Sequence, residues 1–175
     1  NKNCESNCKQ YSINVFLIRD PKKSLPSFYH VLTQNGYFSD KFIKFIPFNF
    51  IKGLFLKHVG YTKLWELYDK CCNFSVPLVI DASDFEANPK AVLEEFCKYT
   101  KIPYINTLKW DQRQIDDFKF AGTKMFHDNI SKSNGINSQT SNYEKTVENN
   151  KLLNKFYDHS ISYYEKLFNQ RHIFT

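Results

Sequence analysis

The sequence predicts an α/β protein in which a parallel β-sheet is flanked by helices. Two short apolar runs, residues 13–18 and 76–81, have the length and the β-branched composition of buried strands. Each run is followed by a turn and then by apolar residues at helical spacing, which is the order of elements that parallel sheets require. A last amphipathic helix, expected to begin at Tyr143, offers an apolar face for packing on the sheet.

The composition is that of a folded chain and favours a small anionic ligand over a nucleic acid. Apolar residues make up 42% of the 175 residues and aromatic residues 17%, and residues 1–175 are expected to form a single domain. The net charge of +6 comes from 24 basic residues, mostly Lys, that are spread along the chain among 18 acidic ones. A nucleic-acid surface usually concentrates its basic residues, Arg in particular, on one face.

Neither a signal peptide nor a transmembrane run is visible in the sequence. The five cysteines are an odd number and lack the Cys-x-x-Cys and His spacing of a zinc site, so reduced thiols in a cytoplasmic protein are expected, although one disulfide such as Cys4–Cys8 stays possible. The first residue is Asn, which suggests a fragment or a processed piece.

Residues 13–18 predict a strand that is buried on both faces, as in a parallel sheet. The strand ends at Arg19-Asp20-Pro21, because Pro21 has no N–H to donate to a neighbouring strand. A helix follows, with apolar residues at Leu25, Phe28, Tyr29 and Leu32, and Asn35-Gly36 is expected to end it.

This turn has the chemistry of an anion site. In α/β folds ligands bind beyond the carboxyl ends of the strands, where the next helix presents its free N–H groups. Arg19 adds a planar fork of donors and Ser27 adds a hydroxyl on the helix. The alternative is structural: Arg19 could cap a neighbouring helix or pair with a carboxylate.

The residues Phe16-Leu17-Ile18-Arg19-Asp20-Pro21, with Ser27 eight positions after Arg19, carry a family resemblance. They resemble the 3′-phosphate-binding segment of the sulfotransferases that use 3′-phosphoadenosine 5′-phosphosulfate (PAPS). In that family the Arg and the Ser of Arg-x-Pro-x-x-x-x-x-Ser hold the 3′-phosphate of the nucleotide. The resemblance therefore implies that Arg19 and Ser27 bind the cofactor.

Residues 37–57 are rich in Phe and Ile and are interrupted by Pro47, Gly53 and several lysines. This stretch is too broken and too charged to span a bilayer. It could cover the core, form a wall of an apolar acceptor pocket, or bind a membrane surface or a partner. In the sulfotransferases the corresponding stretch often helps to shape the acceptor site.

The next elements repeat the strand-and-helix order. Residues 60–72 predict an amphipathic helix with Trp65 and Tyr68 in the core, and residues 76–81 predict a second buried strand. The acidic turn at residues 84–87 leads to Asn88-Pro89, the N-cap and first-turn residues of a helix over residues 90–101. Sulfotransferases have the same order, but many carry a Tyr near the adenine where this chain has Ala82 and Ser83.

Residues 104–137 have no regular pattern. They contain Lys132 in a basic run with a glycine, in the region where relatives close the nucleotide site with a basic loop. The resemblance makes Lys132 a candidate phosphate ligand, although the Arg-Lys-Gly form of the cytosolic members is missing. His127 is either a general base or a surface residue, and no catalytic residue is assigned.

The resemblance implies a P-loop nucleoside-triphosphatase-like fold that lacks its first strand and phosphate loop, because no Gly-, Ser- or Thr-rich turn for the 5′-phosphosulfate is found. The chain would be the second half of a sulfotransferase domain that uses PAPS, yields the product PAP (3′-phosphoadenosine 5′-phosphate) and transfers a sulfuryl group to a small hydroxyl or amine acceptor, with no metal ligand set. The alternatives are a truncated, non-catalytic relative that binds a partner, a nucleotide kinase that uses ATP and Mg²⁺, and, with least support, a nucleic-acid-binding protein.

Overall fold

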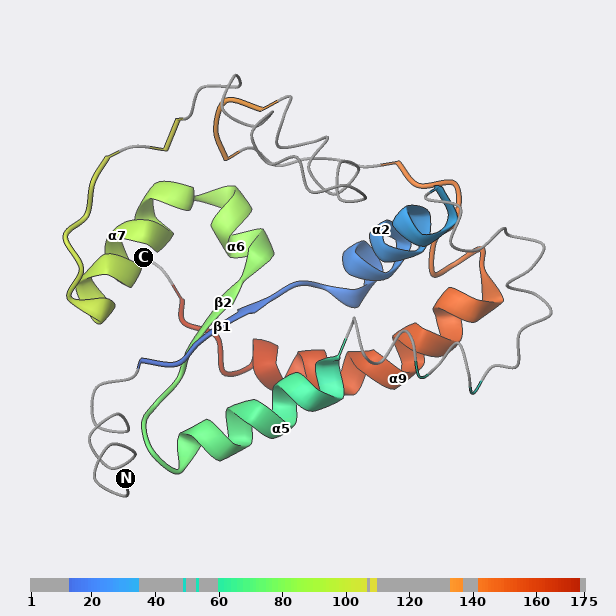
Figure 1. Cartoon of the computed structure of the whole chain (residues 1–175), viewed down its shortest axis with the longest axis horizontal. Coiled ribbons are helices and arrows are strands. Elements are labelled where there is room, and N and C mark those ends of the chain that lie inside the picture. Colours follow the sequence, from blue (N-terminus) through green and yellow to red (C-terminus); the bar gives the residue numbers. More distant parts are fainter. Residues whose placement is uncertain are drawn as a thin grey trace, which may run out of the picture.

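The computed structural model describes residues 13–34, 49, 53, 60–106, 108–109, 133–136 and 142–173. Its elements follow the chain in the order β1 (Val15–Ile18), α2 (Pro21–Gln34), α5 (Tyr61–Cys72), β2 (Leu78–Asp81), α6 (Ala82–Ala87), α7 (Pro89–Thr100) and α9 (Lys151–Phe168) (Figure 1). This arrangement confirms an α/β architecture.

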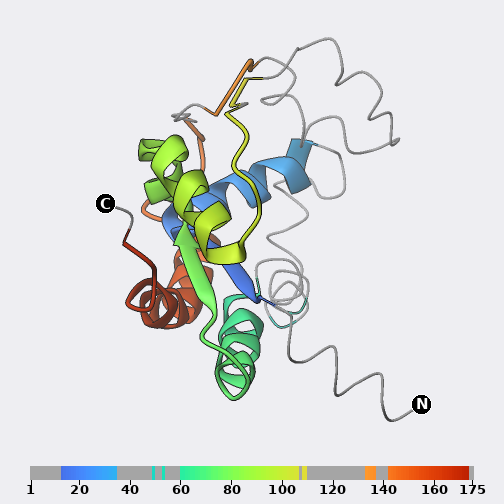
Figure 2. The same ribbon diagram turned by 90° about the vertical axis from the view of Figure 1, so that its left-hand side faces the viewer.

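The described sheet has two parallel strands, β1 and β2. Their register pairs Val15 with Leu78 and Ile18 with Asp81, so both strands end at the same level. Helix α7 lies on one side of the sheet, and α5 and α9 lie on the other (Figure 2). Beyond α9 the chain turns back along β2, where the backbone N–H of His172 donates to the carbonyl of Val79 at 2.9 Å.

Three apolar clusters hold these elements together. One joins α2 to α9 and the residues before α9, and a second fills the space between the sheet, α5 and α9. The third joins β2 to α7 through Leu78, Ile80 and Val92. Helix α9 belongs to the first two clusters, which confirms the expected packing of the last helix on the sheet.

The prediction that the first strand is buried on both faces is wrong. Phe16 and Ile18 are buried against α5 and α9, but Leu17 on the other face is 63% exposed and Val15 is 40% exposed. In β2, by contrast, all four residues are buried, as expected. The difference arises because α6 and α7 pack on β2, and no described element covers the same face of β1.

Two boundaries also differ from the sequence prediction. The expected acidic turn after the second strand is a short helix, α6, because the Asp81 side chain caps it by accepting from the backbone N–H of Ser83. The last helix begins at Lys151 and not at Tyr143, because Asn150 is its N-cap and residues 142–150 form bends and turns. Val147, expected on the helix face, joins the core from this segment.

Several predicted features lie outside the described residues. They are Cys4 and Cys8, the Asn35-Gly36 helix end, most of residues 37–57, His127 and Lys132. Cys71, Cys72 and Cys97 are free thiols. Within the described ranges, none of the helices combines the length and the apolar composition that crossing a membrane requires.

Candidate functional site

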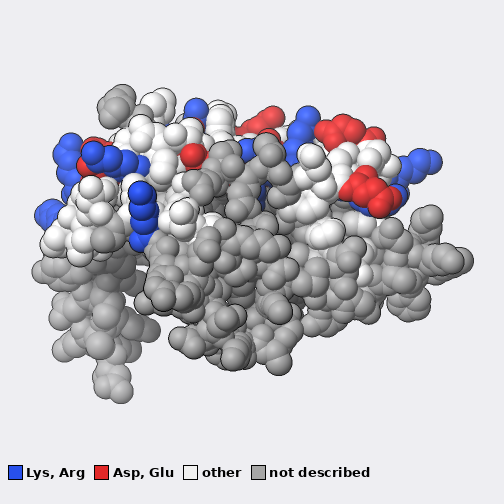
Figure 3. Space-filling view, turned by 90° about the horizontal axis from the view of Figure 1, so that it is seen from above, with Lys and Arg blue, Asp and Glu red and all other residues white. Residues whose placement is uncertain are grey.

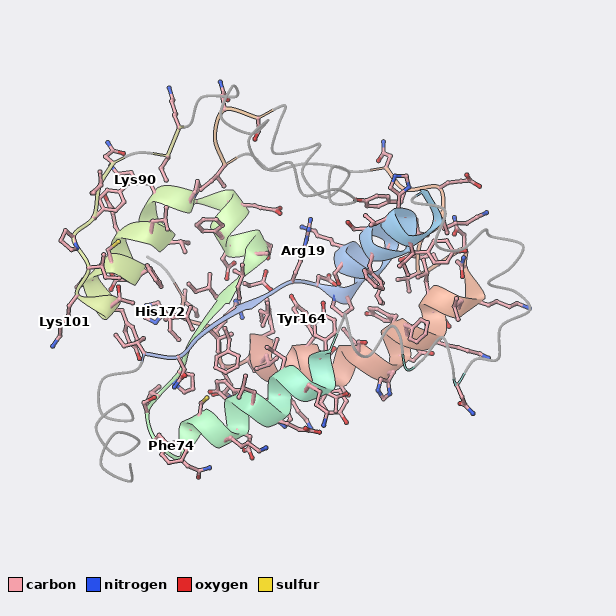
Figure 4. All side chains as sticks on the ribbon, in the orientation of Figure 1. Arg19, Phe74, Lys90, Lys101, Tyr164 and His172 are labelled. Atoms are coloured by element: carbon pink, nitrogen blue, oxygen red, sulfur yellow. The ribbon has the colours of Figure 1, made fainter. Side chains whose placement is uncertain are left out.

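A pocket of about 240 Å³ lies where the two parallel strands end. Arg19, Asp20 and Lys23 line it from the β1–α2 side, and Asp81, Ala82, Ser83 and Glu86 line it from the β2–α6 side. Tyr164 and Phe168 of α9 complete the lining. Figure 4 shows Arg19 between the end of β1, the start of α2 and α6, with Tyr164 reaching toward the same region from α9.

The turn after β1 is built by Asp20. Its Oδ1 accepts from the backbone N–H of Lys22 at 2.7 Å, and its carbonyl accepts from the N–H groups of Lys23 and Ser24. Pro21 is the first residue of α2, where a missing N–H costs nothing. The Asp20 side chain therefore caps the start of α2. The positive charge at the pocket comes from the side chains of Arg19 and Lys23.

The backbone of Arg19 is held by a buried tyrosine. The Tyr61 hydroxyl donates to the Arg19 carbonyl at 2.5 Å and lies 2.8 Å from Ser24 Oγ. Because a phenol has one proton to donate, the Ser24 hydroxyl donates to Tyr61. The hydrogen bond from Tyr61 holds the end of β1 in place, and burial raises the pKa of Tyr61 to about 12.

The floor of the pocket is the buried carboxylate of Asp81, which is 1% exposed. Its Oδ1 accepts from the backbone N–H of Ser83 at 2.8 Å and from the Ser83 hydroxyl, and its Oδ2 accepts from the Tyr164 hydroxyl at 2.9 Å. Burial and the Asp81 charge both raise the pKa of Tyr164. Asp81 therefore ties β2, α6 and α9 together, and its oxygens are already engaged.

Two cations face the pocket and share one carboxylate. Glu86 Oε1 lies 3.7 Å from an Arg19 guanidinium nitrogen, and Glu86 Oε2 lies 3.9 Å from Lys23 Nζ. The side chains of Arg19 and Lys23 are about half exposed, at 44% and 51%. Both separations exceed hydrogen-bond length, so these are loose ion pairs whose N–H groups stay accessible to another acceptor.

The lining as a whole carries three carboxylates and two cations. The Asp20 and Asp81 carboxylates serve as helix caps, which leaves Glu86 as the carboxylate that faces the cations. On the face shown in Figure 3, basic and acidic side chains lie interspersed.

Arg19 lies in the pocket, as the sequence predicts, but Ser27 is not part of the lining. Lys23 and Ser27 are four residues apart on α2, so Ser27 lies on the same side of the helix, one turn beyond Lys23. The Ser27 hydroxyl makes no hydrogen bond within the described part of the chain. Lys132, the third predicted cofactor ligand, lies outside the described residues.

Of the nine residues that line the pocket, Arg19 was predicted as a site residue and the other eight were not, among them Lys23, Glu86, Tyr164 and Phe168. Lys23 had a usable signal, because it stands four positions after Arg19 and four positions before Ser27, which places it on the same side of the predicted helix as Ser27. The only sequence signal for Glu86 was its place in the acidic stretch at residues 84–87. Tyr164 and Phe168 belong to the apolar face of the last helix, and no pattern indicates that one end of this face borders a site more than 140 residues from Arg19 in sequence.

The described residues contain no group of three or more His, Cys, Asp or Glu side chains that could hold a metal ion. In comparisons with known proteins, no family model, no curated protein and no solved structure matches this chain.

Proposed function

We propose that this chain supplies the 3′-phosphate half of a PAPS-binding site in a sulfotransferase with a P-loop nucleoside-triphosphatase-like fold. The reaction would be the in-line transfer of a sulfuryl group from PAPS to a hydroxyl or amine acceptor, leaving PAP. The observation that carries the proposal is the position of Arg19: it lies directly after a parallel strand, at the start of a helix, and lines a pocket at the carboxyl edge of the sheet.

The residues present fit a phosphate group. Arg19 offers a planar pair of donors that matches two phosphate oxygens, and Lys23 adds a second cation beside it. Typical pockets for whole organic ligands are roughly 300 to 1,000 Å³, and at about 240 Å³ this one suits a phosphate better than an entire nucleotide. Ser27, one turn farther along α2, would donate to the same phosphate.

Within such an enzyme the role of these residues is to position the nucleotide. Fixing the 3′-phosphate aligns the distant sulfuryl group with its acceptor, and alignment of reacting groups supplies much of the rate in group transfer. In the described part of the chain β1 leads into Arg19-Asp20-Pro21 and β2 into Ala82. Neither turn has the glycine-rich loop that would hold the 5′-phosphosulfate.

One observation favours the alternative, a non-catalytic relative in which Arg19 is structural. Glu86 pairs with both Arg19 and Lys23, as it would if these residues formed a purely structural ion-pair network. The two functions make opposite predictions for nucleotide binding, so a titration separates them.

The test is calorimetric titration of the chain with PAP, and separately with ATP plus Mg²⁺. The wild-type chain should bind PAP. Arg19→Ala should weaken PAP binding at least tenfold, because one lost charge-assisted contact is worth about 1.5 to 3 kcal/mol. The affinity of Arg19→Lys for PAP should fall between those of the wild type and Arg19→Ala, because lysine keeps the charge but lacks the planar guanidinium.

Matched controls come from the same helix and from a distant surface. Ser27→Ala should weaken PAP binding. Ser24→Ala removes the contact with Tyr61, so it should lower the free energy of unfolding but reduce the affinity for PAP less than Ser27→Ala does. Lys90→Ala removes one positive charge on α7, paired with Glu94. It should bind PAP like the wild type. Equal PAP affinity in wild type and Arg19→Ala, or no PAP binding at all, would refute the proposal, and binding of ATP with Mg²⁺ alone would favour a kinase.

A further inference from the structure

Glu86 pairs with both cations that line the pocket. Its two carboxylate oxygens each face a different cation, Arg19 from the end of β1 and Lys23 from the first turn of α2. The Glu86 side chain is 22% exposed and comes from α6, the helix on the opposite side of the pocket. A phosphate that pairs with both cations would compete with this carboxylate for the same N–H groups.

The contacts of Glu86 with the two cations are long. At 3.7 and 3.9 Å neither contact is a hydrogen bond, and both cations are about half exposed to solvent. Ion pairs of this exposed kind typically change an equilibrium by a factor of about 1.5 to 5 each. Direct hydrogen bonds from the same donors to a phosphate are shorter and stronger.

We infer that Glu86 is an internal competitor of the ligand: it holds Arg19 and Lys23 together in the free protein and is displaced when a phosphate binds. This inference rests on the proposed function, because it takes the 3′-phosphate of PAP as the displacing group. It assigns to Glu86 a regulatory effect on affinity. Asp81 has a different role, because its carboxylate is buried and accepts hydrogen bonds from Ser83 and Tyr164.

The test compares wild type and Glu86→Gln by titration with PAP at low salt. Glu86→Gln keeps the size of the side chain and removes its charge, so PAP should bind about 3- to 10-fold more tightly, which corresponds to the loss of two weak ion pairs. Glu86→Ala should also bind PAP more tightly than the wild type. Glu86→Asp keeps the charge and should stay much closer to the wild-type affinity than Glu86→Gln.

Two control variants separate local competition from a change in net charge. Glu94→Gln removes one negative charge from the surface of α7, where Glu94 pairs with Lys90. Glu148→Gln removes a carboxylate that pairs with Lys22, the neighbour of Lys23 on α2. Neither residue lines the pocket, so both variants should bind PAP with the wild-type affinity. In a Lys23→Met background the gain from Glu86→Gln should shrink, because one of the two competing pairs is already gone.

The outcomes distinguish the two proposals. If wild type binds PAP and Glu86→Gln binds equally or more weakly, Glu86 orients Arg19 for the ligand or is neutral, and the competitor role is overturned while the proposed function stands. If neither protein binds PAP, the proposed function fails and the competitor role fails with it. If the two control variants tighten binding as much as Glu86→Gln does, a general charge effect replaces the specific one.

Discussion

Two buried tyrosines at the site hold its backbone and its buried carboxylate in place. The Tyr61 hydroxyl donates to the carbonyl of Arg19, and the Tyr164 hydroxyl donates to Asp81, so each phenol fixes one group beside the pocket. The two rings also pack edge-to-face, with their centroids 6.3 Å apart. The position of Arg19 therefore depends on contacts that extend from α5 and α9 to the end of β1.

The raised pKa of Tyr61 leads to a prediction for alkaline pH. An unfolded tyrosine loses its proton near pH 10, whereas burial raises the pKa of Tyr61 to about 12. Folding therefore binds a proton between these values, so the stability that Tyr61 contributes is fully present below pH 10 and is lost as pH rises toward 12. Each pKa unit is worth about 1.4 kcal/mol.

Spectrophotometric titration of wild type and Tyr61→Phe checks this prediction. At a pH of about 11, midway between the two pKa values, the native proteins should ionise the same number of tyrosines, because Tyr61 is still protonated. In concentrated urea the wild type should ionise one more than the variant. A difference of one tyrosinate between the native proteins at this pH would show that Tyr61 titrates normally.

At the scale of elements, helix ends decide where the structure departs from expectation. Asn88 caps α7 by accepting from the N–H of Ala91 at 3.2 Å, as the Asn88-Pro89 pair predicts. Asn150 caps α9 by accepting from Leu152 and Leu153, which the apolar periodicity from Tyr143 did not reveal. The apolar residues keep helical spacing through Val147 although the backbone there is not helical, so their periodicity overestimates the length of the helix.

A pair of Asn→Ala substitutions tests the cap of α9. Asn150→Ala should lower the free energy of unfolding by about 1 kcal/mol, because two N–H groups lose their acceptor. Asn154 is exposed in the interior of the same helix, so Asn154→Ala should raise the free energy of unfolding by a few tenths of a kcal/mol through helix propensity. Urea denaturation of both variants measures the difference. A similar effect of the two substitutions would show that the helix does not begin at Asn150.

The sequence predicts the elements of this site better than their assembly. The two strands, the helices after them and Arg19 at the strand end follow from local patterns: apolar runs, Pro21 and the Asn88 cap. Two features depend on contacts between residues far apart in the chain. Glu86 meets Arg19 only because β1 and β2 end in register, and Tyr164 reaches Asp81 only because α9 packs under the sheet.

At the scale of the whole molecule, the sheet is covered unevenly. β2 is buried on both faces, and its outer edge receives the segment after α9 through His172. β1 buries Phe16 and Ile18, while Val15 and Leu17 on its other face are exposed among the described residues. The apolar character of the first run predicted burial on both faces, because composition alone cannot show that α7 covers one strand and leaves its neighbour open.

This asymmetry predicts different costs for two Leu→Ala substitutions. Leu167 is 0% exposed between α9 and the sheet, so Leu167→Ala should lower the free energy of unfolding by about 2 to 5 kcal/mol through the lost burial and the cavity. Leu17 is 63% exposed, so Leu17→Ala should cost less than about 1 kcal/mol. Urea denaturation at equal protein concentration compares the two variants with the wild type. A cost for Leu17→Ala that approaches that of Leu167→Ala would mean that the open face of β1 is covered in solution, and a dependence of that cost on protein concentration would identify a second copy of the chain as the cover.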